Sequence, residues 1–391
     1  MNILMVADDF FPSVIDSRTR ILNELSKSLA KKGNNVYVLT CVQQVNTGSD
    51  YHGVLDGVKI KRYQVNSRGN LAFHFSSLIN SFSLFNQISK ETSFDLINFY
   101  QPLTAWGVNF TKMARKIPQV YTLHSLGSQE CKVENEKNKI QSFVNRWLER
   151  KIVKNCRKVI VSNELSRERA IDYYRIKKSK IEIIPVGVDT EKFSPLKNKE
   201  SLKSDFGVSP DKFVLFSLCP PTPGAGVKNL IKAMSAVVKK NPDLVLIIGV
   251  EGALGEGIKS EVNHSGLDGQ IKLEGNIEVN FLPYCYRVAD LFILPDINQE
   301  GSGLIALEAL SCGVPVLGAP GGRVREILGS LDQDLLFKDN TPESIAEKIL
   351  AYSSSMNLLE LSQKCRDFVV SNYSWNRICE IYEKNYSEIV R

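Results

Sequence analysis

The sequence predicts an α/β protein made of two doubly wound domains in tandem. Three observations lead to this fold class. The chain has 391 residues, which is too long for one ordinary core. Short β-branched runs alternate with segments of helical spacing along its whole length. A polar stretch without apolar period, Val186 to Pro210, interrupts this alternation and predicts a linker.

The first half begins with a βαβ pattern. A strand at Ile3–Ala7 precedes a helix that ends at Gly33, and a second strand follows at Val36–Thr40. Continuous apolar runs are typical of parallel strands buried on both faces. Further strands are expected at Val58–Tyr63, Asp95–Phe99, Gln119–Leu123, Lys158–Ser162 and Ile181–Val186.

The second half repeats the alternation. Strands are expected at Phe213–Leu218, Leu244–Gly249, Gln270–Leu273, Asp290–Leu294 and Val314–Gly318, with helices at Asn229–Lys240, Gly303–Cys312 and Pro342–Tyr352. Because ligands of such sheets bind beyond the carboxyl ends of the strands, we expect the functional cleft to lie between the domains. The domain boundaries are predicted at 190 and 372.

Composition excludes several classes of protein. Hydrophobic residues make up 43% and charged residues 24%, as in soluble globular proteins. The eight cysteines form no metal-binding pattern, and the first residues do not resemble a signal peptide, so we expect reduced thiols and a cytoplasmic location. Residues 1–200 carry 31 lysines and arginines against 19 acids, and the remainder 18 against 24. The basic half is therefore expected to meet an anionic partner.

A glycine-rich loop after an apolar strand predicts a phosphate site. The strand ends at Pro295, and a helix is expected to begin near Ser302 or Gly303. Backbone N–H groups at a helix start bind phosphate well because they have no partner within the helix and the dipole favours an anion. The residues expected to bind a diphosphate in this way are Gly301, Ser302, Gly303, Leu304 and Ile305.

Two glutamates flank this loop. Glu308 lies inside the expected helix, from where it can point toward a ribose, and Glu300 precedes the helix, near the position of a bound sugar. The alternative is that Glu300 is a surface loop acid and Glu308 a solvated helix residue. The intervening glycines and the apolar residues around Glu308 favour the nucleotide-sugar site.

Several motifs in order resemble glycosyltransferase family 4, whose members have the GT-B fold of two Rossmann-like domains. Glu300 and Glu308 match the E-x7-E motif of the retaining enzymes. The resemblance extends over nearly the whole chain. The other matching segments are Ile3–Pro12 with Lys32–Thr40, Val120–His124, Ile181–Asp189, Leu273–Asn276, Gly321–Glu326 and the ending that begins at Tyr373.

The resemblance implies roles for particular residues. Lys228 matches the lysine that binds the donor diphosphate, Glu308 the ribose-binding glutamate and Glu300 the glutamate that contacts the transferred sugar. His124 matches the histidine near the far hydroxyls of the sugar, and Asn276 lies where the backbone of family members contacts the base. The resemblance also implies an acceptor-binding domain at 1–190, a donor-binding domain at 191–372, and a helix at 373–391 that packs back on the first domain.

Three departures from the family pattern stand out. The paired glycines of the first loop are replaced by Asp16 and Ser17, and the family's phosphate-binding arginine by Cys219. Arg323 is a candidate to replace that arginine. The family's Asn-Gly before Asp189 is here Val-Gly, which we interpret as structural drift.

Two other segments have competing interpretations. Lys139 to Lys158 carries seven basic residues and one acid, with apolar residues and Trp147 at helical spacing. Such a helix either contacts an anionic membrane or packs its apolar stripe into the first domain. Asp332 and Asp334 form a D-x-D sequence, which we interpret as a solvated turn and not as a metal site.

The residues and the resemblance to glycosyltransferase family 4 together imply a retaining, metal-independent hexosyltransferase that uses a nucleotide-diphosphate sugar. The expected acceptor is a glycan or a lipid-linked molecule in the synthesis of cell-surface polysaccharide or glycolipid, at the inner face of the membrane. No further cofactor, metal or nucleic acid is expected. The alternatives are a sugar-nucleotide-binding protein with little or no activity and a nucleotide-sugar 2-epimerase.

Overall fold

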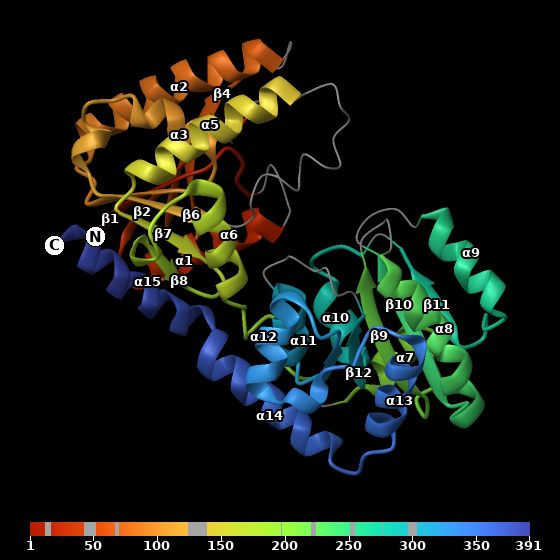
Figure 1. Cartoon of the computed structure of the whole chain (residues 1–391). Helices are drawn as coiled ribbons and strands as arrows, with labels where there is room; N and C mark the ends of the chain where they lie inside the picture. Colours follow the sequence, from red (N-terminus) through yellow and green to blue (C-terminus); the bar gives the residue numbers. More distant parts are fainter. Residues whose placement is uncertain are drawn as a thin grey trace. The chain divides into compact units, whose positions relative to one another are not determined.

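The computed structural model describes residues 1–11, 17–42, 52–66, 70–123, 139–196, 198–219, 224–250, 255–275, 277–295 and 303–391. Its contacts divide the chain into two units, each with its own sheet of mostly or wholly parallel strands (Figure 1). Unit 1 consists of Met1–Gly187 and Trp375–Arg391, and unit 2 of Val188–Ser374. No helix among these residues has the length and hydropathy of a bilayer-spanning segment.

The sheet of unit 1 has the strand order β3-β4-β2-β1-β5-β6-β7-β8, and only the pair β3 and β4 is antiparallel. From β1 the chain builds outward through β2 and β4, then crosses back to β5, so the direction of building reverses between β1 and β5. The strands are β1 (Asn2–Val6), β2 (Asn35–Val42), β3 (His52–Leu55), β4 (Val58–Gln64), β5 (Leu96–Phe99), β6 (Gln119–Leu123), β7 (Lys158–Val161) and β8 (Ile181–Ile183).

Helices cover both faces of this sheet. On one face α2, α3 and α5 pack side by side, with α3 in the middle, and α1 packs against α15 on the other. Residues of β5 show the two faces, since Ile97 and Phe99 belong to the core under α2 whereas Asn98 donates a hydrogen bond to Tyr386 of α15 (2.6 Å). The helices are α1 (Ser17–Lys31), α2 (Asn70–Glu91), α3 (Pro102–Asn109), η1 (Ala114–Lys116), α5 (Lys139–Asn155), α6 (Glu164–Tyr174), η3 (Lys178–Lys180) and α15 (Trp375–Val390).

The sheet of unit 2 is wholly parallel, in the order β11-β10-β9-β12-β13. Its central strands are buried along their length, as the continuous apolar runs predicted. The strands are β9 (Phe213–Cys219), β10 (Leu244–Val250), β11 (Ile271–Glu274), β12 (Leu291–Leu294) and β13 (Val316–Gly318). The helices are α7 (Glu200–Asp205), α8 (Ala225–Lys240), α9 (Glu256–Ser265), α10 (Leu282–Val288), α11 (Leu304–Ser311), α12 (Gly322–Leu331), η4 (Gln333–Leu335), α13 (Pro342–Ser353) and α14 (Leu358–Tyr373).

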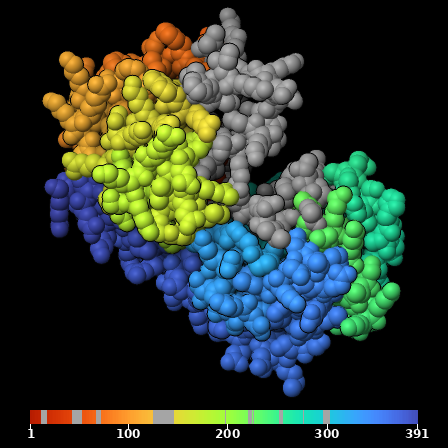
Figure 2. Space-filling model, viewed as in Figure 1, coloured from red at the N-terminus to blue at the C-terminus, as the bar shows by residue number. Residues whose placement is uncertain are grey.

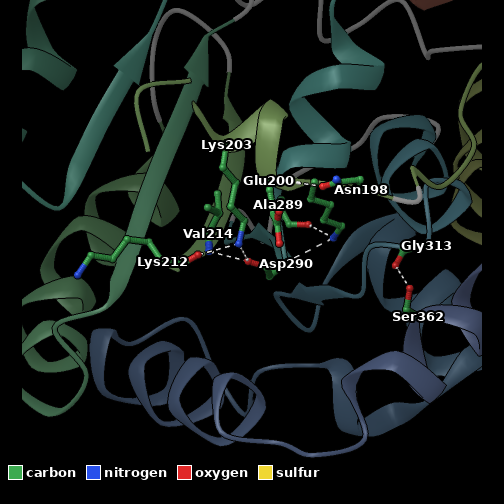
Figure 3. A network of polar contacts seen from close by, with 10 residues as sticks. Asn198, Glu200, Lys203, Lys212, Val214, Ala289, Asp290, Gly313 and Ser362 are labelled. Carbon is green, nitrogen blue, oxygen red and sulfur yellow. Dashed lines mark hydrogen bonds and ion pairs between the residues drawn. The ribbon is translucent and has the colours of Figure 1, made fainter. Parts of the chain in front are cut away.

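A polar network fixes the amino ends of β9 and β12 (Figure 3). Asp290 accepts hydrogen bonds from the Val214 amide (2.9 Å) and from Lys203 of α7 (3.0 Å), and Lys199 lies 3.7 Å from its other oxygen. This places α7 inside the stretch that the sequence predicted to be only a linker. The short helix escaped prediction because its contacts with Asp290 join residues far apart in the chain.

Cysteines in the described ranges are all free and buried, as expected of reduced core thiols. Burial raises the pKa of Cys156 and Cys285 to about 12. These thiols are therefore protonated near neutral pH and are poor nucleophiles.

The pair α2 and α3 meets at Gly107. A Cβ at this position would lie 2.6 Å from the carbonyl oxygen of Leu78 and would also collide with the Ser81 hydroxyl of α2. The absence of a side chain thus lets the two helices approach closely.

We expect Gly107→Ala to lower the free energy of unfolding by about 1–3 kcal/mol, because the backbone of one helix must move to admit the methyl group. Gly329→Ala in α12 is the matched control, since nothing lies within 4 Å of that Cβ position. Because alanine has a higher helix propensity than glycine, this control should raise the free energy of unfolding by up to about 1 kcal/mol. Urea unfolding measures both, and equal effects would contradict the close approach.

Candidate functional site

The candidate site of unit 2 lies where the order of its strands reverses. The chain builds from β9 outward to β10 and β11, then returns to β12 on the other side of β9. After β9 the chain enters α8 at Ala225, and after β12 it enters α11 at Leu304. Open parallel sheets bind ligands beyond the carboxyl ends of the strands at such a reversal. The N-termini of α8 and α11 are therefore the elements that a ligand would meet.

Gly303 begins α11 in a left-handed conformation, with φ +75°. A Cβ on it would lie 2.7 Å from Cγ of Arg323, so glycine is required both for the conformation and for the space. The first bond within the helix runs from the Leu307 amide to the Gly303 carbonyl (3.1 Å). The amides of Leu304 and Ile305 therefore lie in the first turn, where N–H groups have no acceptor within the helix and favour an anion.

Glu308 is completely buried in the second turn of α11. Tyr286 of α10 donates a hydrogen bond to its Oε2 (3.0 Å), and the Tyr286 ring packs edge-on against Phe216 and Phe292. The alternative that Glu308 is a solvated helix residue is thereby wrong. Its carboxyl group therefore has a hydrogen-bond partner inside the domain, on an aromatic side chain that is itself packed in the core.

Lys228 lies in the first turns of α8, at the same edge of the sheet. Its side chain is half-exposed and forms an ion pair with Glu261 of α9 (2.8 Å), which holds the pKa of that carboxyl below its usual value. An anion at the start of α8 would compete with Glu261 for this lysine.

Cys219 supplies no positive charge at the end of β9. Its buried Sγ donates to the Gly249 carbonyl of the neighbouring strand (3.4 Å). Arg323 supplies a positive charge near the start of α11, where its side chain runs past Gly303. Its guanidinium bonds to Glu326 (2.6 Å) and lies over the Tyr373 ring. A second cation is therefore present beside the start of α11.

Five predicted site residues lie outside the described residues, as does Asp16. These are His124, Asn276, Glu300, Gly301 and Ser302. Their roles stay predictions.

Asp332 and Asp334 bond to groups of the protein itself. Asp332 accepts from the Asp334 amide at the start of η4 and pairs with Lys364 (3.1 Å), and Asp334 pairs with Lys348 (3.5 Å). This agrees with the predicted solvated turn. Within the ranges that the structure describes, no three acidic, histidine or cysteine side chains come together as metal ligands.

Asp8 of unit 1 is a candidate functional residue that the sequence analysis did not identify. It follows β1 at the reversal of unit 1, and its carboxylate accepts the amides of Thr104 (2.6 Å) and Leu103 (3.3 Å) at the start of α3. Burial raises the pKa of Asp8 to about 6, although these two amides act in the opposite direction. The sequence signal was present, since an acid directly after a buried strand end marks the ligand edge of such a sheet.

Comparisons with known proteins assign the chain to a family. Residues 198–368 match the family model described as "Glycosyl transferases group 1", and residues 19–192 match "Glycosyltransferase Family 4". A D-inositol 3-phosphate glycosyltransferase of Paenarthrobacter aurescens is 22% identical, with 70% of this chain and 68% of the relative covered. An uncharacterized glycosyltransferase of Methanocaldococcus jannaschii is 21% identical, with 97% of this chain and 96% of the relative covered.

Solved structures share the fold. Anabaena HepE, crystallised in complex with UDP and glucose, superposes with a TM-score of 0.74 at 16% identity, covering 99% of this chain and all of that one. The protein thus has the GT-B architecture of two Rossmann-like domains. Because the two family models together span most of its length, the chain belongs to glycosyltransferase family 4 and is a glycosyltransferase.

We expect Tyr286→Phe to lower the free energy of unfolding by about 1.5–3 kcal/mol, because a hydrogen bond to a buried carboxylate is lost. Tyr284→Phe is the control, since Tyr284 is an exposed residue of the same helix. Urea unfolding compares them. If the two variants are equally stable, Tyr286 does not hold Glu308.

Asp8 predicts a pH dependence of stability. The folded protein holds this proton more tightly than the unfolded chain, whose aspartate pKa is about 4. The stabilising contribution is therefore complete below about pH 4 and is lost as the pH rises to about 6. Between about pH 4 and pH 6 we expect the free energy of unfolding of the wild type to fall by about 1–3 kcal/mol relative to that of Asp8→Asn. Asp9→Asn serves as the control, and parallel profiles of wild type and Asp8→Asn would refute the assignment.

Proposed function

We propose that this glycosyltransferase moves a hexose from a nucleotide-diphosphate sugar to a glycan or lipid-linked acceptor, with retention at the anomeric carbon and without a metal ion. One observation carries the proposal. The N-termini of α8 and α11 flank the strand reversal of unit 2, one with Lys228 and the other with the buried Glu308. This is a set of groups suited to a diphosphate and an attached ribose.

In the proposed reaction, the bond between the anomeric carbon and the β-phosphate oxygen breaks while the acceptor oxygen bonds to that carbon from the same face. Negative charge that develops on the β-phosphate would be stabilised by the amides of Gly301 to Ile305 and by Lys228. The departing diphosphate takes the acceptor proton, so no side chain is required as nucleophile. Glu300 and His124 are proposed to hold the sugar, and Asn276 to lie at the base.

Arg323 is proposed as the second phosphate cation. Two findings support it: Cys219 bonds within the sheet, and the Arg323 side chain passes the Gly303 cap. A neighbour of known structure, Anabaena HepE, was solved with UDP and glucose, and we extend to this chain only the use of a nucleotide-sugar donor.

The pathway and location are further proposals. We place the acceptor on unit 1, in the synthesis of a cell-surface polysaccharide or glycolipid at the cytoplasmic face of the membrane. The excess of lysine and arginine in the first half of the chain supports an anionic environment for that unit.

We expect Lys228→Ala to lower the turnover number by about 10²–10³-fold, the effect of removing one donor from a stabilised anion. Lys232→Ala, one turn further along α8 and exposed, is the matched control and should retain activity. Release of nucleoside diphosphate from a panel of nucleotide sugars measures both. Full activity of Lys228→Ala would overturn the assigned role.

A sugar-nucleotide-binding protein without transfer activity is the second candidate, favoured by the neutral Cys219 where a cation is usual. The same panel distinguishes it. A binder is stabilised against heat by a nucleotide sugar, because the ligand binds only the folded state, yet releases no diphosphate with or without acceptor. A hydrolysis rate that Glu300→Ala abolishes would instead support the enzyme.

A further inference from the structure

One face of unit 1 exposes several large apolar side chains. The helices α2, α3 and α5 lie side by side, and their orange and yellow segments reach the surface of unit 1 (Figures 1 and 2). We call this surface the α2–α3–α5 face, which includes the residues directly after α3. Its exposed apolar residues are Phe75, Ile79, Phe82, Phe110, Met113 and Trp147.

On α2 the exposed apolar residues form a stripe. Phe75, Ile79 and Phe82 follow one another at helical spacing, and Phe75 is 69% exposed. No charged residue occurs in this helix before Lys90. A helix whose outer face contacts only water normally carries charged residues there, so this outer stripe is suited to an apolar partner.

Aromatic rings gather on α3 and α5. The Trp106 ring lies 5.1 Å from Phe110 and 5.9 Å from Trp147, centroid to centroid. Lys151 holds its ammonium 4.8 Å from the Trp147 ring and 5.7 Å from Trp106. Trp147 is still 51% exposed, so the cluster offers an aromatic surface next to a cation.

Positive charge lies on the α3 and α5 side of this face. Between α3 and β6, the exposed Lys112, Arg115 and Lys116 flank Met113, and no acid occurs from 102 to 118. The single acid of α5, Glu149, accepts a hydrogen bond from Tyr121 of β6 (2.9 Å) and so is directed toward the sheet. The surface beside α5 is consequently basic.

We propose that the α2–α3–α5 face docks on the surface of an anionic phospholipid bilayer. Phe75, Ile79 and Trp147 would enter the boundary between headgroups and acyl chains, where aromatic rings are favoured. The lysines and arginines would meet anionic headgroups. A second copy of the same face is a poorer partner, because two basic surfaces repel. The inference depends on unit 1 alone and is independent of the transfer reaction.

Cosedimentation with vesicles tests the proposal. We expect the full chain to bind vesicles of phosphatidylcholine with 30 to 40% phosphatidylglycerol, to bind pure phosphatidylcholine far more weakly, and to dissociate as salt is added. Phe75→Ser with Ile79→Ser should weaken binding by about tenfold or more, and Lys112→Glu with Lys116→Glu by at least as much.

Matched controls come from unit 2. Met356 and Leu359 are 99% and 85% exposed, and Lys239 and Lys240 are exposed lysines of α8. Met356→Ser with Leu359→Ser, and Lys239→Glu with Lys240→Glu, should leave vesicle binding unchanged. Circular dichroism confirms that each variant is folded, and diphosphate release from the donor in the absence of lipid should stay at the wild-type rate in all of them.

Three results would overturn the proposal. The first is absence of binding to anionic vesicles. The second is equal loss of binding in the unit 2 controls, which would indicate general charge attraction. The third is a lipid-free dimer that the Phe75→Ser and Ile79→Ser pair dissociates without any change in vesicle binding, which would make the face an interface between copies. If donor turnover fails while vesicle binding follows the expected pattern, the proposed function is wrong and the docking surface stands.

Discussion

The parallel pairing of the strands is the constraint on which the rest of this molecule depends. Parallel neighbours cannot be joined by a tight turn, so each connection must cross a face of the sheet, usually as a helix. All strands of unit 2, and those of unit 1 apart from the antiparallel β3, therefore end at one edge of their own sheet, and the N-termini of the helices that follow them lie at that edge. In unit 2 this brings the starts of α8 and α11 to the two sides of one reversal, although 79 residues separate Ala225 from Leu304. The donor chemistry proposed for this enzyme is a consequence of that topology.

Sequence patterns predicted most of the strands because burial on both faces leaves a direct signal, as in Leu244–Val250. They also predicted the end of α1, where Gly33 has a φ of +89°. The strand β3 was not predicted, although the dipeptide Asp56-Gly57 is typical of a tight hairpin turn. Both residues have positive φ and connect β3 to β4. Helices α7 and α10 are too short to show a helical period.

The candidate site was predictable only in outline. Spacing from the glycines placed Glu308 on the correct helix, but its burial and its bond to Tyr286 depend on a residue 22 positions away. The pairing of Lys228 with Glu261 likewise joins two helices that no local pattern relates. Asp8 was overlooked although its place after a strand end was visible, whereas its bonds to the amides at the start of α3 join residues 95 and 96 positions apart and were not predictable from local sequence. Local sequence thus identifies which side chains are present at the site, and tertiary packing decides what each one bonds to.

The last helix gives the protein an order of assembly. Because α15 belongs to unit 1, the Asn98 amide of β5 reaches its Tyr386 partner only after all of unit 2 has left the ribosome. The domain that is synthesised first is therefore the one that is completed last. Until α15 has been synthesised, part of one face of the unit 1 sheet stays exposed, and the nascent chain can associate wrongly through it.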